Sequence, residues 1–217
     1  MTWSLNEIEA LSRKAARGAG LSWGLAEEAG KAARWLVAQG LPGPQVLADL
    51  LTRNDGKDYE TLCPHDDDGG HWTARGGTLC PLISGAALCD HASRLAAGEA
   101  LHLGRTASPM LLLPYLDAAA RIAGREVTVS WAGVTLTCGT PDGMPTDMAP
   151  DLTADMVDAV SIHPGNRCDT DAIPPTTRGD IPETTARTLD AFAQRTYAPE
   201  TEASRLAGAG AGLTDND

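Results

Sequence analysis

The sequence predicts an α+β protein in which an N-terminal helical layer packs on a mainly antiparallel sheet, with long irregular loops. Two observations support this prediction. Roughly the first fifty residues carry apolar side chains at helical spacing, whereas residues 126–138 alternate between apolar and polar side chains as strands do. Helices and strands that occupy separate parts of a chain are typical of α+β architectures.

Three helices are predicted in residues 4–53. Ser4 and Glu7 have the spacing of a capping box at the start of the first helix. Ser22 is a suitable N-cap for the second helix, and Pro44 suits the first turn of the third. We interpret this part of the chain as a helical lead-in whose apolar stripes pack into the core.

The next part of the chain is less regular. Residues 54–80 show no hydrophobic period and are interpreted as a long ordered loop. Residues 81–95 are predicted to form a strand or turn that leads into a helix capped by Ser84. A strand is expected at residues 101–103, and a helix at residues 116–124.

The clearest strand signal follows. Residues 126–131 and 134–138 both alternate and flank Ala-Gly, which predicts a hairpin, and a third strand is expected near residues 156–162. Residues 163–217 are rich in Pro, Thr, Asp and Gly, apart from a short helical stretch at 185–194. Composition alone therefore predicts a loosely attached tail.

The length of 217 residues suits one domain. We divide it into the helical lead-in (1–53), an α+β core (54–162) and the C-terminal segment (163–217). The net charge of −12 argues against nucleic acid or an anionic membrane surface as a partner. A small-molecule ligand is the expected partner, and self-association into a homo-oligomer is compatible with the sequence.

Localisation is predicted from three absences in the sequence. The N-terminus shows no export signal, and the longest apolar run is far too short to span a membrane. The five cysteines form an odd number without a regular framework, which favours reduced thiols over disulfides. These features predict a cytoplasmic protein.

The strongest candidate site lies in a 29-residue window that contains six of the ten cysteines and histidines of the chain. These six residues are Cys63, His65, His71, Cys80, Cys89 and His91. Thiolate, imidazole and carboxylate groups form the usual ligand set for zinc or ferrous iron. We predict Cys63, His65, His71, Cys89 and His91 as metal ligands, and Asp68, from the adjacent run of three aspartates, as a further ligand or general base.

Three alternatives remain open for this window. No CxxC or HExxH spacing is present, so most of its residues could be structural, with Cys80 and Cys89 as small core side chains. Cys63 or Cys89 could instead form a nucleophilic thiolate–imidazolium pair with a nearby histidine. A purely structural zinc site inside a binding protein is the third alternative.

Two weaker candidates would bind an anion. Arg105 and Ser108 precede an apolar segment, where free helix amides could hold a carboxylate or phosphate, although Ser108 could simply be an N-cap. Arg205 lies beside a Gly-Ala run that is either a ligand-approaching backbone or a flexible tail. His102, between two leucines, is interpreted as a structural histidine, and His163 as a polar turn residue. No nucleotide-binding motif is present, so no nucleotide cofactor is expected.

Three stretches carry a resemblance to a known family: Ser4 to Ala10, Gly18 to Gly30 with its Ser-Trp-Gly-Leu-Ala-Glu-Glu run, and Gly208 to Asp217. They resemble a bacterial family catalogued only as a domain of unknown function (number 3726), over nearly the whole chain. The resemblance implies a stand-alone bacterial protein whose C-terminal segment is part of the domain. It implies no reaction, cofactor or catalytic residue.

Together these features favour a small-molecule metabolic enzyme, specifically a metal-assisted hydrolase or lyase. The alternative is a non-catalytic protein, either a ligand-binding module or an accessory subunit of a metabolic complex. A bound metal ion would favour the enzyme, and tolerance of alanine at His65 and His71 would favour the alternative.

Overall fold

The computed structural model describes residues 2–67, 69–139, 150–165 and 177–197. The elements follow in the order β1 (Thr2–Ser4), α1 (Leu5–Gly18), α2 (Trp23–Ala38), α3 (Gly43–Asn54), α4 (Tyr59–Leu62), β2 (Pro64–Asp66), β3 (His71–Ala74), α5 (Pro81–Asp90), α6 (Ala92–Ala96), β4 (Leu101–Leu103), β5 (Thr106–Ala107), η1 (Pro109–Leu112), α7 (Leu113–Ala123), β6 (Val127–Trp131), β7 (Val134–Cys138), η2 (Pro150–Thr153), β8 (Met156–Val157), β9 (Val160–Pro164), β10 (Arg178–Asp180) and α8 (Glu183–Gln194). This composition confirms the α+β class.

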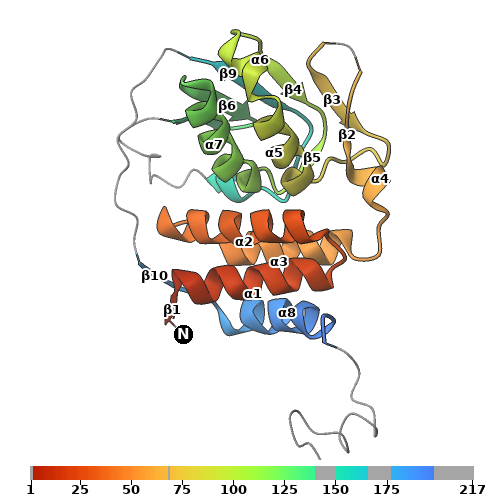
Figure 1. Ribbon diagram of the computed structural model, residues 1–217, viewed down its shortest axis with the longest axis vertical. Coiled ribbons are helices and arrows are strands. Elements are labelled where there is room, and N and C mark those ends of the chain that lie inside the picture. Colours follow the sequence, from red (N-terminus) through yellow and green to blue (C-terminus); the bar gives the residue numbers. More distant parts are fainter. Residues whose placement is uncertain (1, 68, 140–149, 166–176, 198–217) are drawn as a thin grey trace, which may run out of the picture.

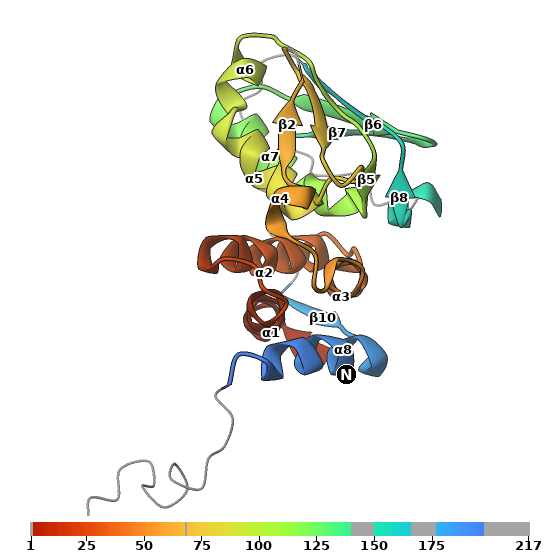
Figure 2. The same ribbon diagram turned by 90° about the vertical axis from the view of Figure 1, so that its right-hand side faces the viewer.

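The elements form two layers, seen one above the other in Figure 1. The helical layer contains α1, α2, α3 and α8. The α/β layer contains a six-stranded sheet with α5, α6 and α7 on one of its faces (Figure 2). The helical layer contacts α5, α7 and η1, so it reaches the sheet through a second set of helices.

The helix starts of the first layer follow the local sequence. The amide of Glu7 donates to the hydroxyl of Ser4 (3.3 Å), and the amide of Ser4 donates to the carboxylate of Glu7 (2.8 Å), so the predicted capping box is confirmed. Ser22 caps α2 by accepting from the amide of Leu25 at 3.4 Å, and Pro44 lies in the first turn of α3. Local chemistry therefore sets where these helices begin.

The C-terminal segment is tied to the helical layer, which corrects the prediction of a loosely attached tail for residues 178–194. β10 pairs antiparallel with β1, and α8 packs on α1 and α3. A Cβ atom added at Gly18 would lie 1.8 Å from the carbonyl oxygen of Phe192, so α1 and α8 are in backbone contact there. Leu189, Phe192 and Ala193 form the buried apolar side of α8, whose opposite side is mostly polar.

The six-stranded sheet has the order β2-β3-β4-β9-β6-β7. Only β3 and β4 pair in parallel, joined by a crossover through α5 and α6, so the sheet is mainly antiparallel as predicted. The hairpin of β6 and β7 is confirmed, and its turn contains Gly133 with φ 77°. The predicted strand near residues 156–162 is two strands, β8 and β9.

Two element predictions between residues 54 and 95 are wrong. Residues 54–80 are not one loop, because α4 and the β2–β3 pair form there. These strands have three and four residues, too few to show a period. Ser84 does not cap a helix, because α5 begins at Pro81 and Ser84 is buried within it.

The helix-covered face of the sheet supplies a large part of the core. Every strand except β2 places a fully or nearly fully buried apolar side chain on this face, including Trp72, Leu101, Leu103, Val127, Val129, Val134, Val160 and Ile162. None of the helices among the described residues is both long enough and apolar enough to cross a membrane.

A candidate histidine site on the open face of the sheet

The sheet separates the histidines of the predicted metal window. His91 is the C-cap residue of α5 and meets Trp72 edge-to-face, with ring centroids 5.6 Å apart. Trp72 belongs to the helix-covered face, where it is buried. His71 precedes Trp72 in β3, and His65 is the register neighbour of Thr73. Because successive side chains of a strand point to opposite faces, His65 and His71 lie on the open face.

Among the cysteines of the window, Cys80 is buried and Cys63 and Cys89 are half-buried. Cys63 is the C-cap residue of α4 and lies beside the hydroxyl of Tyr59. Burial raises the pKa of the Cys63 thiol. The Cys89 thiol donates to the carbonyl oxygen of Tyr115 (3.4 Å), and burial raises its pKa to about 11. Burial likewise raises the pKa of Cys80. All three environments favour the neutral thiol over the thiolate that metal binding and nucleophilic attack require.

Asp66, the last residue of β2, and Asp67, which follows it, have different hydrogen-bond partners. Asp66 accepts from the amide of Gly70 (2.9 Å) and from Arg94 (2.7 Å), which holds its pKa below the ordinary value. Asp67 accepts from the hydroxyl of Thr73, next to the open-face histidines. Asp68, the predicted catalytic carboxylate, lies outside the described residues.

The described part of the chain contains no group of three or more His, Cys, Asp or Glu side chains placed to hold a metal ion. The five predicted ligands are therefore not brought together: His65 and His71 share one face of the sheet, and His91 lies on the other. Cys63 and Cys89 are half-buried, the first directly after α4 and the second within α5.

The structure does assemble a different set of histidines. His71 is the register neighbour of His102, and His102 that of Ser161, two residues before His163 in β9. Register neighbours and alternate residues of a strand share one face. We call this surface the histidine face, and it comprises His65, His71, His102 and His163 with the hydroxyl residues Thr73, Thr128, Ser130 and Ser161.

Three imidazole rings form a row across β3, β4 and β9. The ring centroids of His71 and His102 are 5.6 Å apart, as are those of His102 and His163. His71 and His163 are exposed, and His102 between them is half-buried. Nδ1 of His102 lies 3.3 Å from the hydroxyl oxygen of Ser161. When Nδ1 donates this hydrogen bond, Nε2 carries the free lone pair.

His65 extends the histidine face toward the sheet edge. Its Nε2 atom is buried and has no hydrogen-bond partner among the described residues. A buried polar atom without a partner is uncommon in folded proteins, and water or a ligand is the usual explanation. Its register neighbour Thr73 donates to Asp67, which brings a carboxylate to this end of the face.

The predicted anion site at Arg105 and Ser108 has one exposed and one buried member. Arg105 is exposed, and its Nε lies 3.8 Å from a carboxylate oxygen of Asp158, whose side chain is almost fully exposed. Ser108 is buried, with φ 42°, and its amide donates to the carbonyl of Asp155. Ser108 occupies the N-cap position of the four-residue η1, with Pro109 in its first turn as that interpretation expects, but its side chain makes no capping hydrogen bond. Arg205 lies outside the described residues.

Sequence reasoning did not place His102 and His163 beside His71, although a signal for their orientation was present. Leu101 and Leu103 face the core, as do Val160 and Ile162. Alternation then places His102, Ser161 and His163 on the opposite face. The alternation of β4 and β9 predicts the face, but only the strand order predicts that the histidines are neighbours.

Fold and surface together define an α+β protein with a two-layer body and a sheet that has one face covered by helices and one face rich in histidine. Residues 3–80 match the model of a family described as "Protein of unknown function (DUF3726)". The match includes the first two stretches on which the resemblance rests, so the resemblance is confirmed there; it does not include residues 208–217. A search of curated proteins finds no match to this chain.

Proposed function

We propose that the protein is a small-molecule enzyme of the hydrolase or lyase type, with its reacting groups on the histidine face. The observation that carries the proposal is the row of three imidazole rings at 5.6 Å spacing. Histidine is the most frequent general acid or base in enzymes and the most frequent metal ligand. Four of the five histidines of the chain gather on this face, which favours a chemical role over packing.

A metal-assisted form of this chemistry is supported by the ring spacing. Two imidazoles bound to one tetrahedral zinc ion have ring centroids about 5 Å apart, given the usual zinc–nitrogen distance. The pair formed by His71 and His102 is within reach of that spacing. The hydrogen bond between His102 and Ser161 orients the His102 ring, as the outer partners of metal ligands commonly do.

The roles then divide along the row. His71 and His102 would bind the zinc or ferrous ion, which lowers the pKa of a bound water toward neutrality. His163, exposed on the far side of His102, would transfer a proton to or from the substrate. The hydroxyl groups of Thr128, Ser130 and Ser161 would hydrogen-bond a small polar substrate.

The setting proposed for this activity is a bacterial cytosol. Cys63, Cys80, Cys89 and Cys138 are all unpaired thiols, as expected for a protein kept in a reducing compartment.

The first experiment is equilibrium dialysis of the full chain against Zn²⁺, followed by Co²⁺ substitution and absorption spectroscopy. We expect one bound ion per chain, lost or weakened at least tenfold in His71→Gln and in His102→Gln. His91→Gln is the matched control, because His91 lies on the other side of the sheet, and it should bind normally. Cobalt spectra without thiolate charge-transfer bands would distinguish the histidine face from a site containing Cys63 or Cys89.

The second experiment tests turnover by the metal-loaded protein on a panel of small esters, amides and lactones. We expect His163→Gln to lower kcat by about 10²- to 10⁴-fold at unchanged metal content. Absence of metal binding under all conditions, or loss of binding in His91→Gln alone, would contradict the metal-assisted proposal. Metal binding without turnover of any substrate would favour the non-catalytic ligand-binding alternative.

A further inference from the structure

A cavity of approximately 270 Å³ lies between the helical layer and the α/β layer, and its lining shares no residue with the histidine face. Its lining comes from the α1–α2 connection, the end of α3, α4 with the residues before it, and the start of α5. The lining residues are Ala19, Gly20, Leu21, Leu50, Leu51, Asn54, Gly56, Lys57, Tyr59, Leu62, Cys80, Leu82 and Ile83.

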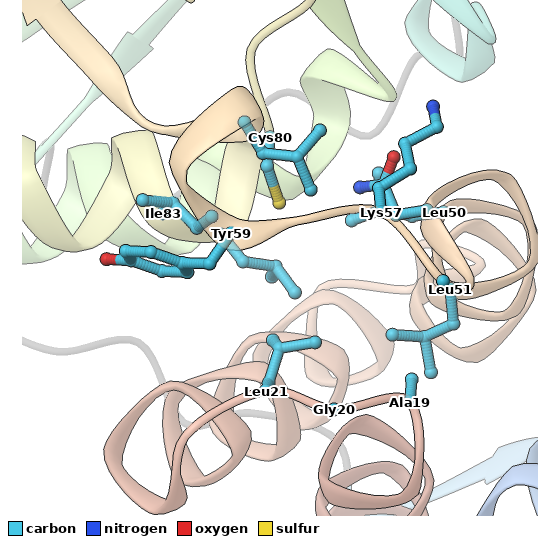
Figure 3. A pocket seen from close by; sticks show the side chains of 13 residues that line it. Ala19, Gly20, Leu21, Leu50, Leu51, Lys57, Tyr59, Cys80 and Ile83 are labelled. Atoms are coloured by element: carbon cyan, nitrogen blue, oxygen red, sulfur yellow. The ribbon is translucent and has the colours of Figure 1, made fainter. Parts of the chain in front are cut away.

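The inner part of this cavity is apolar and uncharged. Figure 3 shows Leu21 and Leu51 on one side and Ile83 with the Tyr59 ring on the other. The Cys80 thiol points into the space between them (Figure 3), and burial raises its pKa, so it remains a neutral, polarisable group. Such a lining excludes an ionised group from the inner cavity and suits a hydrocarbon.

Lys57 is the cationic residue of the lining and lies at the rim of the cavity. Figure 3 shows the Lys57 side chain extending away from Ala19, Gly20 and Leu21, so its amino group lies at the opposite end of the lining. No ion-pair partner of Lys57 occurs among residues 2–67, 69–139, 150–165 and 177–197. An apolar cavity with a cation at one end is complementary to an amphipathic anion.

We propose that this cavity binds a medium-chain fatty carboxylate, with its alkyl chain among the leucines and its carboxylate beside Lys57. At the packing density of protein interiors, about 0.75, the cavity holds roughly ten methylene-sized groups. The site is independent of the histidine face. Almost all of its lining lies within the family-matched residues 3–80, whereas His102 and His163 lie outside them.

The chain length of the ligand provides the first test. Saturated carboxylates of six to fourteen carbons are titrated into the full-length protein by calorimetry, below their micellar concentrations. We expect affinity to rise about fourfold for each added methylene, because each is transferred from water to an apolar lining, and to stop rising near ten carbons, when the cavity is full. Failure of decanoate to bind, or a rise that continues unchanged to fourteen carbons, would overturn the proposal.

Two variants locate the ligand. Ala19→Leu places three extra carbon atoms into the cavity. It should lower the affinity for decanoate at least tenfold, and the carboxylate that binds most tightly should be a shorter one. Ala97→Leu is its control, because Ala97 also ends a helix, with φ −73° and ψ −8° against −79° and 0° for Ala19, but is exposed. Equal binding by the two variants would overturn the assignment of the alkyl chain to this cavity.

Lys57→Met removes the charge and keeps the apolar stem. This variant should bind decanoate about tenfold more weakly than the wild type and bind decanol with unchanged affinity. If decanoate and decanol bind the wild type equally, or if Lys57→Met weakens both to the same extent, the carboxylate assignment is wrong.

Discussion

The two faces of the six-stranded sheet are built from the same strands and are used in opposite ways. The covered face packs Trp72, Leu101 and their neighbours against α5, α6 and α7, and these side chains are almost fully buried. The open face carries His71, His102 and His163, of which His71 and His163 are exposed to solvent. A residue's role in this sheet thus depends on which side of the pleat it occupies, more than on its neighbours in the chain.

The difference teaches that enrichment along the sequence is a poor guide to a site in a sheet. The window from Cys63 to His91 is rich in ligand-type residues, yet the sheet lies between His71 and His91. His102 and His163 are 61 positions apart, yet their rings are 5.6 Å apart. The side chains of adjacent residues in one strand point to opposite faces of the sheet, whereas register neighbours in two paired strands place their side chains side by side on one face.

The largest expected difference in the free energy of unfolding is between variants of two adjacent residues of β3. Trp72→Ala removes a buried ring from the covered face and should lower the free energy of unfolding by about 3–5 kcal/mol. Thr73→Ala removes a partly exposed hydroxyl from the open face and should cost about 1 kcal/mol or less. Urea denaturation followed by circular dichroism measures both. Similar losses in the two variants would contradict the assignment of the faces.

A smaller difference in stability is expected between two Gly→Ala variants, one in the helices that cover the sheet and one on its open face. A Cβ atom at Gly85 of α5 would lie 2.4 Å from the Tyr115 ring, and this ring is buried, so Gly85→Ala should destabilise by roughly 1–3 kcal/mol. Gly104, after β4, would place its Cβ 3.5 Å from the Thr73 methyl group, an ordinary contact. Gly104→Ala should therefore change stability by about 0.5 kcal/mol or less. Thermal denaturation of both variants tests this, and a costlier Gly104→Ala would show that the open face is the tighter one.

The smallest expected effect depends on pH and separates the two neighbouring aspartates. The amide of Gly70 and the guanidinium of Arg94 hold the pKa of Asp66 below its ordinary value of 3.8. A carboxylate with a lowered pKa stabilises the folded state above its ordinary pKa, and that stabilisation is lost as pH falls through the folded-state pKa. Asp66→Asn should therefore flatten the loss of stability below about pH 4 in urea titrations at several pH values. Asp67→Asn is the control, and an equal flattening there would refute the special role of Asp66.

Much of the fold was predictable because its signals are local. The capping box at Ser4, the N-cap at Ser22 and the strand alternation in residues 126–138 each depend on residues a few positions apart. The elements that were not predicted correctly lack such local signals. β2 and β3 are too short for a period to show, and α8 joins the helical layer through contacts with α1 that no local pattern encodes.

The candidate site was predictable only in part. His65 and His71 were identified from their residue type and from enrichment, and both lie on the histidine face. Their proposed partners in the window are unsuited or point elsewhere, because partial burial keeps the Cys63 and Cys89 thiols neutral and His91 packs on Trp72. The alternation of β4 and β9 could have revealed that His102 and His163 point away from the core.

The sequence by itself determined where α1 and α2 start, that residues 126–138 form a hairpin, and that the chain is acidic and of the α+β class. Tertiary structure alone decided that β3 lies beside β4 and β4 beside β9, and so which histidines meet. It also decided that the α1–α2 connection, α3, α4 and α5 enclose a cavity. The physical reason is that caps and hydrophobic periods act over a few residues, whereas strand order and layer packing minimise the exposed apolar surface of the whole chain at once.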